Sequence, residues 1–267
     1  MRIVITNDDG VAAPGIRHLA RHAREAGHDV VVAAPHTEVS GAGAALTATV
    51  REGRLLYETV TLDGLDGLDG VPAYSVPASP AYIAVLAGLG AFGERPDVLL
   101  SGINRGANAG HAILHSGTVG AVLTGAGDGL RGMAVSLDIL GEVALNALSS
   151  VDDDRRNWPA AATIAVGLLD WLFEAPAGTA LNLNVPDRPV EAIAGLRPAT
   201  LAPFGQVQMT LAEHGSDFVR TALKERGEER IPGSDVALLG EGYATITAVV
   251  PPVRHPTLQP PTRWRAD

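Results

Sequence analysis

The chain has 267 residues, no cysteine and a formal net charge of −10 at pH 7. The negative charge argues against a broad nucleic-acid-binding surface, which needs clustered Lys and Arg, and the lack of cysteine excludes disulfides, thiolate catalysis and Cys-ligated zinc. Hydrophobic residues make up 46% of the chain and aromatic residues 4%, so Val, Leu, Ile and Ala must form the core. Met1 leads directly into a strand-like run, and neither a signal peptide nor an apolar span of membrane length is evident, which makes the cytoplasm the expected location.

The N-terminal region predicts a βαβ unit. Residues 2–6 (RIVIT) form an apolar run typical of a buried strand, and Pro14 opens a stretch with apolar residues at helical spacing that ends at Gly27. Residues 29–34 (DVVVAA) are typical of a second strand. Two strands joined through a helix in this way run parallel, with a right-handed crossover.

The same alternation continues along the chain. Further strands are predicted at residues 97–101, 133–137 and 181–185, and further helices at 81–89, 116–129 and 159–174. This order of elements indicates the α/β class with a mostly parallel sheet. Residues 62–70 read LDGLDGLDG, either a calcium-binding tract or a Gly/Asp loop expanded by repeat slippage. We favour the loop because calcium repeats need many stacked copies. The acidic run 152–154 is interpreted as a solvated loop.

The character of the sequence changes near residue 204. Residues 204–232 are polar and charged, whereas residues 243–250 (YATITAVV) alternate like a strand. We therefore divide the chain into a catalytic core, residues 1–203, and a C-terminal extension, residues 204–267. The extension is expected to be a β-hairpin or arm used in self-association, with its last strand returning to the core.

Short oxygen-bearing segments follow three of the predicted strands. Asn7, Asp8, Asp9 and Gly10 follow the first strand, Ser40 and Gly41 follow the second, and Asn104 follows the third. Because ligands bind outside the carboxyl ends of parallel strands, these groups are expected to meet at one edge of the sheet. Carboxylate, hydroxyl and amide oxygens suit Mg²⁺, Mn²⁺ or Ca²⁺. Asp-Asp-Gly alone is also an ordinary turn, and the adjacent pair does not fit the Asp-x-Asp pattern of HAD-type phosphatases.

The segment HSGTVGAVLTG begins at His115 and places Ser116, Gly117 and Thr118 at the start of a predicted helix. Helix N-terminal N–H groups form an anion pocket, although an ordinary Ser N-cap is the alternative interpretation. Beside a metal site, the pocket is interpreted as a phosphate cradle. His115 and His111 are the nearest candidates to protonate a leaving alkoxide, since imidazole titrates near pH 6.5. The alternative is that His115 only fills space at the helix start.

Several segments resemble the signature blocks of the SurE family of 5′/3′-nucleotidases. They are IVITNDDG, APHTEVSGAGAALT, PDVLLSGINRGANAG and HSGTVGAVLTG, with LNLNVP and SDVALLGEGYATITAV later in the chain. The resemblance spans nearly the whole chain. It implies a Rossmann-like three-layer core and metal-dependent hydrolysis of phosphomonoesters. It also implies one divalent ion per subunit, Mg²⁺ or Mn²⁺ (or Ca²⁺ in a crystal), and homodimers or homotetramers built partly by exchanged C-terminal segments.

The matching motifs also imply roles for individual residues. The metal ligands would be Asp8, Asp9, Ser40 and Asn104. The phosphate and substrate site would comprise Asn7, Gly41, Asn108, Ser116, Gly117 and Thr118. Asp8, Asp9 and His115 are the expected catalytic residues.

The sequence departs from the family pattern at three positions. His115 stands where Tyr is usual, Thr124 where Glu is usual, and Ser79 where Asp is usual. The expected activity is release of phosphate from nucleoside monophosphates. One alternative is the same chemistry on a phosphorylated sugar or secondary-metabolite intermediate, and a remote alternative is a non-catalytic nucleotide-binding module. In each case the partner is a small phosphate ester or nucleotide, not a nucleic acid polymer or a membrane.

Overall fold

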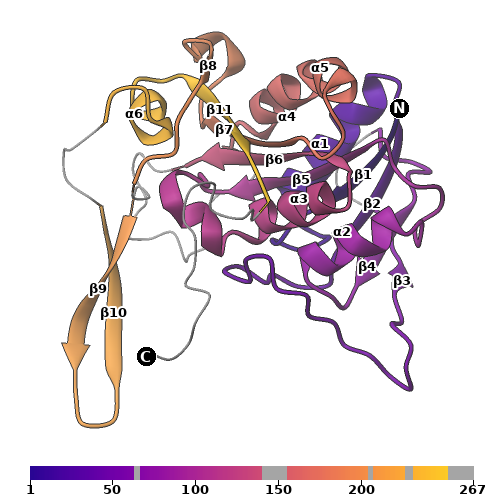
Figure 1. Ribbon diagram of the computed structural model, residues 1–267, viewed down its shortest axis with the longest axis horizontal. Coiled ribbons are helices and arrows are strands. Elements are labelled where there is room, and N and C mark those ends of the chain that lie inside the picture. The colour runs from indigo at the N-terminus through magenta and orange to yellow at the C-terminus, as the bar shows by residue number, and fades with distance from the viewer. Residues whose placement is uncertain (63–66, 140–154, 204–206, 226–230, 252–267) are drawn as a thin grey trace, which may run out of the picture.

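The computed structural model describes residues 1–62, 67–139, 155–203, 207–225 and 231–251. Its centre is a nine-stranded sheet covered by helices on both faces (Figure 1). This arrangement confirms the predicted three-layer α/β class. The LDG repeat lies partly outside the described residues, and the acidic run 152–154 lies wholly outside them.

The central sheet has the strand order β3-β4-β2-β1-β5-β6-β7-β11-β8. Strands β1, β2, β4, β5, β6 and β7 are mutually parallel, β3 and β11 run antiparallel to β4 and β7, and β8 is parallel to β11. The strands are β1 (Arg2–Thr6), β2 (Asp29–Pro35), β3 (Glu58–Thr59), β4 (Ala73–Val76), β5 (Val98–Arg105), β6 (Arg131–Asp138), β7 (Ala180–Pro186), β8 (Leu196–Pro198) and β11 (Ala244–Val249).

Two groups of helices enclose the sheet. Helices α1 (Pro14–Glu25), α4 (Trp158–Gly167) and α5 (Leu169–Glu174) lie on one face, and α2 (Pro80–Gly88) and α3 (Gly117–Gly127) lie on the other (Figure 1). The single helix predicted from residue 159 to near 174 is two helices, because the first ends at Gly167 and Leu168 caps it. The short helices are η1 (Gly110–His115), η3 (Val190–Ala192) and α6 (Asp235–Gly240).

The core lies on both sides of the sheet, which explains why its strands are continuous apolar runs. Ile3 and Ile5 of β1 belong to the cluster that includes Ile16 and Leu19 of α1. Val4, between them, points to the opposite face and joins the cluster beneath α2. Each strand therefore buries successive side chains in different layers, and its carboxyl end is held firmly at the edge of the sheet.

The C-terminal part is divided between two locations. Strands β9 (Val207–His214) and β10 (Val219–Glu225) form a separate antiparallel pair that projects away from the core (Figure 1). In contrast, α6 packs near the main sheet, and β11 pairs with β7 inside it. A boundary at residue 203 remains a prediction. Within the described ranges, every helix is too short or too polar to cross a membrane.

Candidate active site

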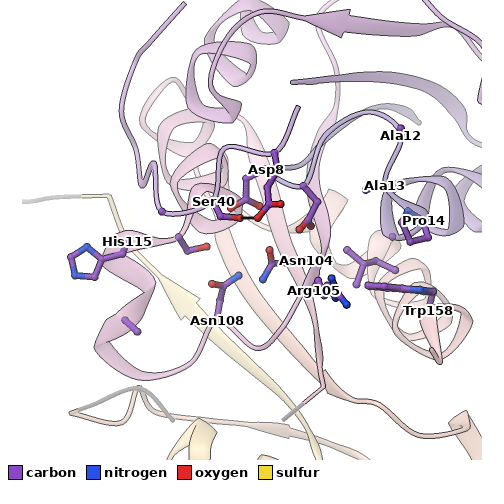
Figure 2. Close-up of a pocket in the computed structure, with 17 residues that line it drawn as sticks. Asp8, Ala12, Ala13, Pro14, Ser40, Asn104, Arg105, Asn108, His115 and Trp158 are labelled. Atoms are coloured by element: carbon purple, nitrogen blue, oxygen red, sulfur yellow. Dashed lines mark hydrogen bonds between the residues drawn. The ribbon is translucent and has the colours of Figure 1, made fainter. Parts of the chain in front are cut away.

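The carboxyl ends of β1, β2 and β5 meet at one edge of the sheet, since β1 lies between the other two. A cavity of about 650 Å³ opens there. Eight of the predicted site residues line it: Asp8, Asp9, Ser40, Gly41, Asn104, Asn108, His115 and Ser116 (Figure 2). The structure thus brings together residues that are up to 108 positions apart in the sequence (116 − 8).

Asp8 is buried and packed against the first turn of α3. The Thr118 hydroxyl donates to its Oδ1 at 2.5 Å, and a Cβ built on Gly117 would lie 2.8 Å from its Oδ2. Burial raises the pKa of Asp8, while hydrogen bonds from the Thr118 side chain and from backbone N–H groups, including those of Thr118 and Gly117, oppose the rise. In this structure the start of α3 therefore stabilises the Asp8 carboxylate.

Asp9 carries a carboxylate oxygen without a hydrogen bond. Its Oδ2 is buried, and no partner for it exists among the described residues. Burial, followed by the neighbouring charge of Asp8, raises the pKa of Asp9 to about 7, although a backbone hydrogen bond and the positive charge of Arg105 oppose the rise. An unsatisfied buried carboxylate beside a second carboxylate is an environment that a bound cation would stabilise.

Asn104 lies within β5, although the sequence analysis ended this strand at residue 101. The pairing of β5 with β6 shifts register between Ser101 and Asn104, so the strand continues past an irregularity to Arg105. The Asn104 Nδ2 donates to the Gly106 carbonyl at 2.7 Å. Its side-chain oxygen points toward Asp8 (Figure 2).

The donor set fits a hard divalent ion. No group of three or more His, Cys, Asp or Glu side chains placed to hold a metal occurs in the described part of the chain. A metal would therefore need the two carboxylates together with Asn104 and Ser40, whose hydroxyl donates to Glu38 Oε1 at 2.7 Å. All of these ligands are oxygens, which favours Mg²⁺ or Mn²⁺ over softer ions.

Three residues predicted to contact substrate are placed behind the cavity. Asn7 is fully buried, and its side chain bonds to the Gly10 carbonyl at 2.9 Å and the Gly10 N–H at 3.2 Å, which shapes the turn. Gly117 and Thr118 support Asp8 and are not among the lining residues. Ser116 does line the cavity, but its hydroxyl accepts the Val119 N–H at 3.1 Å as an ordinary N-cap. Among these four residues only Ser116 lines the cavity, and a role in substrate binding remains a prediction for all of them.

Comparison with known proteins agrees with this geometry. Residues 3–208 match the family described as Survival protein SurE. The chain belongs to the SurE family. It is 34% identical to a 5′-nucleotidase SurE from Stenotrophomonas maltophilia, covering 99% of this chain and 95% of the relative. It is 37% identical to a 5′-nucleotidase SurE from Solidesulfovibrio magneticus, over 92% of this chain and 90% of the relative. The crystal structure of the SurE protein from Aquifex aeolicus superposes with a TM-score of 0.72 at 26% identity, over 94% of this chain and 93% of that one.

Of the three departures from the SurE pattern, only His115 lies at the cavity. The Ser79 hydroxyl donates to the Ala45 carbonyl at 2.5 Å and accepts the Tyr82 N–H as the N-cap of α2. The Thr124 hydroxyl donates to the Gly120 carbonyl at 2.7 Å within α3. Both residues have structural partners away from the cavity, so they give no reason to expect an altered substrate.

His115 stands at the rim of the cavity. It is exposed, and its ring points away from Asp8 and Asn104 (Figure 2). His111 is exposed as well and does not line the cavity. The catalytic role of His115 therefore remains a prediction.

Nine residues that line the cavity were not among the predicted site residues, and three of these nine carry charged or aromatic side chains. Glu38 lies two positions before Ser40, and Arg105 directly follows Asn104, so both stood inside the quoted SurE segments. Trp158 begins α4 and is 2% exposed. No local sequence signal marks Trp158, because it reaches the cavity only through the packing of α4 against α1.

Proposed function

We propose that the chain is a divalent-metal-dependent phosphomonoester hydrolase that releases phosphate from nucleoside monophosphates. Its SurE relatives are named 5′-nucleotidase and 5′/3′-nucleotidase, which supports this activity. The observation that carries the proposal is the adjacent Asp8–Asp9 pair, in which a buried Asp9 oxygen lacks a partner among the described residues. Such a pair fits a site that binds a cation and, through it, an anionic phosphate.

The metal would be held by Asp8, Asp9, Ser40 and Asn104, with one ion per subunit. When bound, a divalent ion polarises phosphoryl oxygens and lowers the pKa of a bound water. Asp8 is fixed by its hydrogen bond from Thr118, and Asp9 lies against the Arg105 backbone. One of the two carboxylates orients the attacking water or accepts its proton. Direct covalent attack by either is less favoured, because both are committed to the metal.

The cavity is larger than a phosphate group requires. Its volume of about 650 Å³ falls within the range of roughly 300–1,000 Å³ typical of small-molecule sites. Beyond the aspartates it is lined by Pro14, Ile103 and Trp158, with the Arg105 guanidinium beside them (Figure 2). This apolar region with one cation is suited to the organic part of a phosphate ester, and a nucleoside matches its size.

His115 is our candidate for protonating the leaving alkoxide. It stands at the rim of the cavity, next to Ser116. Its ring would have to turn inward from the orientation in Figure 2 to reach a leaving group. Rotation about χ1 of an exposed side chain is fast, so this orientation is compatible with the role.

A panel of phosphate esters tests the proposed function. Phosphate release would be measured from 5′- and 3′-nucleoside monophosphates, sugar phosphates and p-nitrophenyl phosphate, in Mn²⁺, in Mg²⁺ and in EDTA. We expect nucleoside monophosphates to give the highest kcat/KM and EDTA to abolish release. If a sugar phosphate were preferred, sugar phosphates would replace nucleoside monophosphates as the proposed substrates. Binding of nucleotide without any release would support a non-catalytic module instead.

A further inference from the structure

Strand β7 carries two asparagines in the middle of the sheet. Asn182 is 0% exposed and Asn184 is 1% exposed, and they alternate with the apolar residues of LNLNVP. Burial of an amide side chain is costly unless it makes hydrogen bonds. Packing in the core alone therefore does not explain why these two positions are asparagine.

Both asparagines bond to the backbone of Asn108. The Asn108 N–H donates to Asn184 Oδ1 at 2.8 Å. The Asn108 carbonyl accepts from Asn184 Nδ2 at 3.0 Å and from Asn182 Nδ2 at 2.8 Å. The Asn108 side chain, in turn, donates from Nδ2 to Ser136 Oγ of β6 at 2.9 Å.

The bonded segment has no regular secondary structure of its own. Asn108 lies between the end of β5 at Arg105 and the start of η1 at Gly110, and its N–H and carbonyl have no backbone hydrogen-bond partner among the described residues. Strand β7 supplies hydrogen-bond partners through the side chains of Asn182 and Asn184, which are 74 and 76 positions away in the sequence. Asn108 itself lines the cavity (Figure 2).

We propose that Asn182 and Asn184 are positioning residues, which hold Asn108 by its backbone so that its side chain faces bound phosphate. The inference rests on the proposed function, because it assigns Asn108 to the phosphate side of that site. It explains why LNLNVP places amides at alternate positions, since side chains two apart on a strand point to the same face.

A purely stabilising role fits the contacts less well. Asn182 Oδ1 is buried and has no hydrogen-bond partner within the described ranges. An unsatisfied buried acceptor opposes folding, so an apolar residue of the same size would serve stability equally well or better. The position of Asn182 is therefore better explained by its single bond to the Asn108 carbonyl.

The test uses Asn184→Leu and Asn182→Leu with a matched control, Thr245→Val. Thr245 is paired with Asn184 across β11 and β7, is fully buried, and its hydroxyl has no partner among the residues described. The control thus replaces a buried polar group beside Asn184 without removing a bond to Asn108. Each Mn²⁺-loaded variant would be titrated with inorganic phosphate by calorimetry, and its kcat, KM and melting temperature would be measured.

We expect Asn184→Leu, which loses two bonds, to raise the phosphate Kd and the KM by about tenfold. Asn182→Leu, which loses one, should raise both by about threefold while melting no lower than the wild type. The Mn²⁺ concentration for half-maximal activity should change less than about twofold in both. Thr245→Val should match the wild type throughout.

Wild-type phosphate affinity and KM in Asn182→Leu would overturn the inference, whether or not Asn184→Leu folds. An equal loss of phosphate affinity in Thr245→Val would overturn the inference as well, because the loss would then come from a general disturbance of the sheet. The proposed function fails separately, if the wild-type protein hydrolyses none of the esters. The phosphate titration would still decide the role of the asparagines in that case.

Discussion

At the scale of single residues, the close contact between Gly117 and Asp8 constrains the position of the Asp8 carboxylate. A Cβ at Gly117 would lie 2.8 Å from Asp8 Oδ2 and 2.9 Å from Asp8 Cβ. Gly117→Ala must therefore displace the carboxylate, and we expect kcat/KM to fall by about 100-fold. Steady-state kinetics in saturating Mn²⁺ would measure the loss.

Gly127→Ala is the matched control for Gly117→Ala. Gly127 is the last residue of the same helix, is exposed, and a Cβ there would meet nothing within 4 Å. Alanine is favoured over glycine in a helix by up to about 1 kcal/mol, so this variant should be fully active and equal or higher in stability. Similar activity in the two variants would mean that Asp8 tolerates displacement, contrary to its assigned role.

The raised pKa of Asp9 predicts a pH-dependent stability for the metal-free protein. The pKa of Asp9 is about 7 in the fold and about 3.8 as its ordinary value. The folded state holds this proton more tightly than the unfolded state. The stabilisation that protonated Asp9 gives to the folded protein is therefore fully present below pH 3.8 and is lost as the pH rises through 7. In EDTA, Asp9→Asn should therefore melt increasingly above the wild type between pH 5 and 8, by a few degrees at pH 8.

Excess Mn²⁺ provides the control for this titration. A bound cation stabilises the ionised carboxylate and should remove the wild-type penalty at pH 8, but it should stabilise Asp9→Asn much less. Parallel melting curves for the two proteins at every pH in EDTA would show that Asp9 is not perturbed in the way its burial indicates.

At the scale of elements, Asp235 joins the C-terminal part to the active-site loop. It is fully buried at the start of α6, and its carboxylate accepts the N–H groups of Gly110 at 2.7 Å and Ala202 at 2.9 Å. Asp235→Ala leaves both donors without their acceptor, so the free energy of unfolding should fall by about 1–3 kcal/mol for each buried group. Urea denaturation would measure this, with the exposed Asp170→Ala as control.

An Asp235→Ala protein as stable as the wild type would show that other acceptors replace the carboxylate. Loss of activity without loss of stability would instead point to a local effect on η1. The Asp170→Ala control should change the free energy of unfolding by less than about 0.5 kcal/mol, because it lies on the surface.

The sequence predicted well those elements whose signal is local. The apolar runs of β1, β2 and β7 and the Pro14 helix start are present as expected, and the convergence of Asp8, Ser40 and Asn104 follows from the parallel sheet itself. The short strands β3, β4 and β8 were missed, because two to four residues carry too little pattern to recognise.

Details that depend on contacts between distant elements could not be predicted. The register shift that keeps Asn104 within β5 depends on pairing with β6. The position of Trp158 at the cavity depends on the packing of α4 against α1. The role of Thr118 is another example, since its hydroxyl donates to Asp8, 110 residues away, and not into the cavity.

At the scale of the whole molecule, the β9–β10 hairpin is the part best suited to self-association. It projects from the core (Figure 1) and exposes Leu211, Phe218 and Val219. The chain leaves the core for the hairpin and returns to it at neighbouring points, since the Thr200 N–H donates to the Gly233 carbonyl at 3.1 Å. We expect replacement of residues 204–232 by a short Gly-Ser linker to keep the core folded and to reduce the oligomer to monomers.

Sedimentation velocity at micromolar concentration would measure this change. The full chain should sediment as a dimer or tetramer, and Phe218→Ser combined with Leu211→Ser should shift it toward the monomer by removing exposed apolar area. A monomeric full chain, or a linker variant with an unchanged oligomer, would assign association to another surface.

We propose that the Asp8–Asp9 pair forms a metal-dependent hydrolytic centre. The most direct measurement is Mn²⁺ binding by electron paramagnetic resonance together with phosphate release from a nucleoside monophosphate, for the wild type and Asp9→Ala. We expect one Mn²⁺ per chain and Mn²⁺-dependent phosphate release in the wild type. In Asp9→Ala we expect loss of both in a folded protein. Near-wild-type turnover by Asp9→Ala in saturating Mn²⁺ would contradict the account.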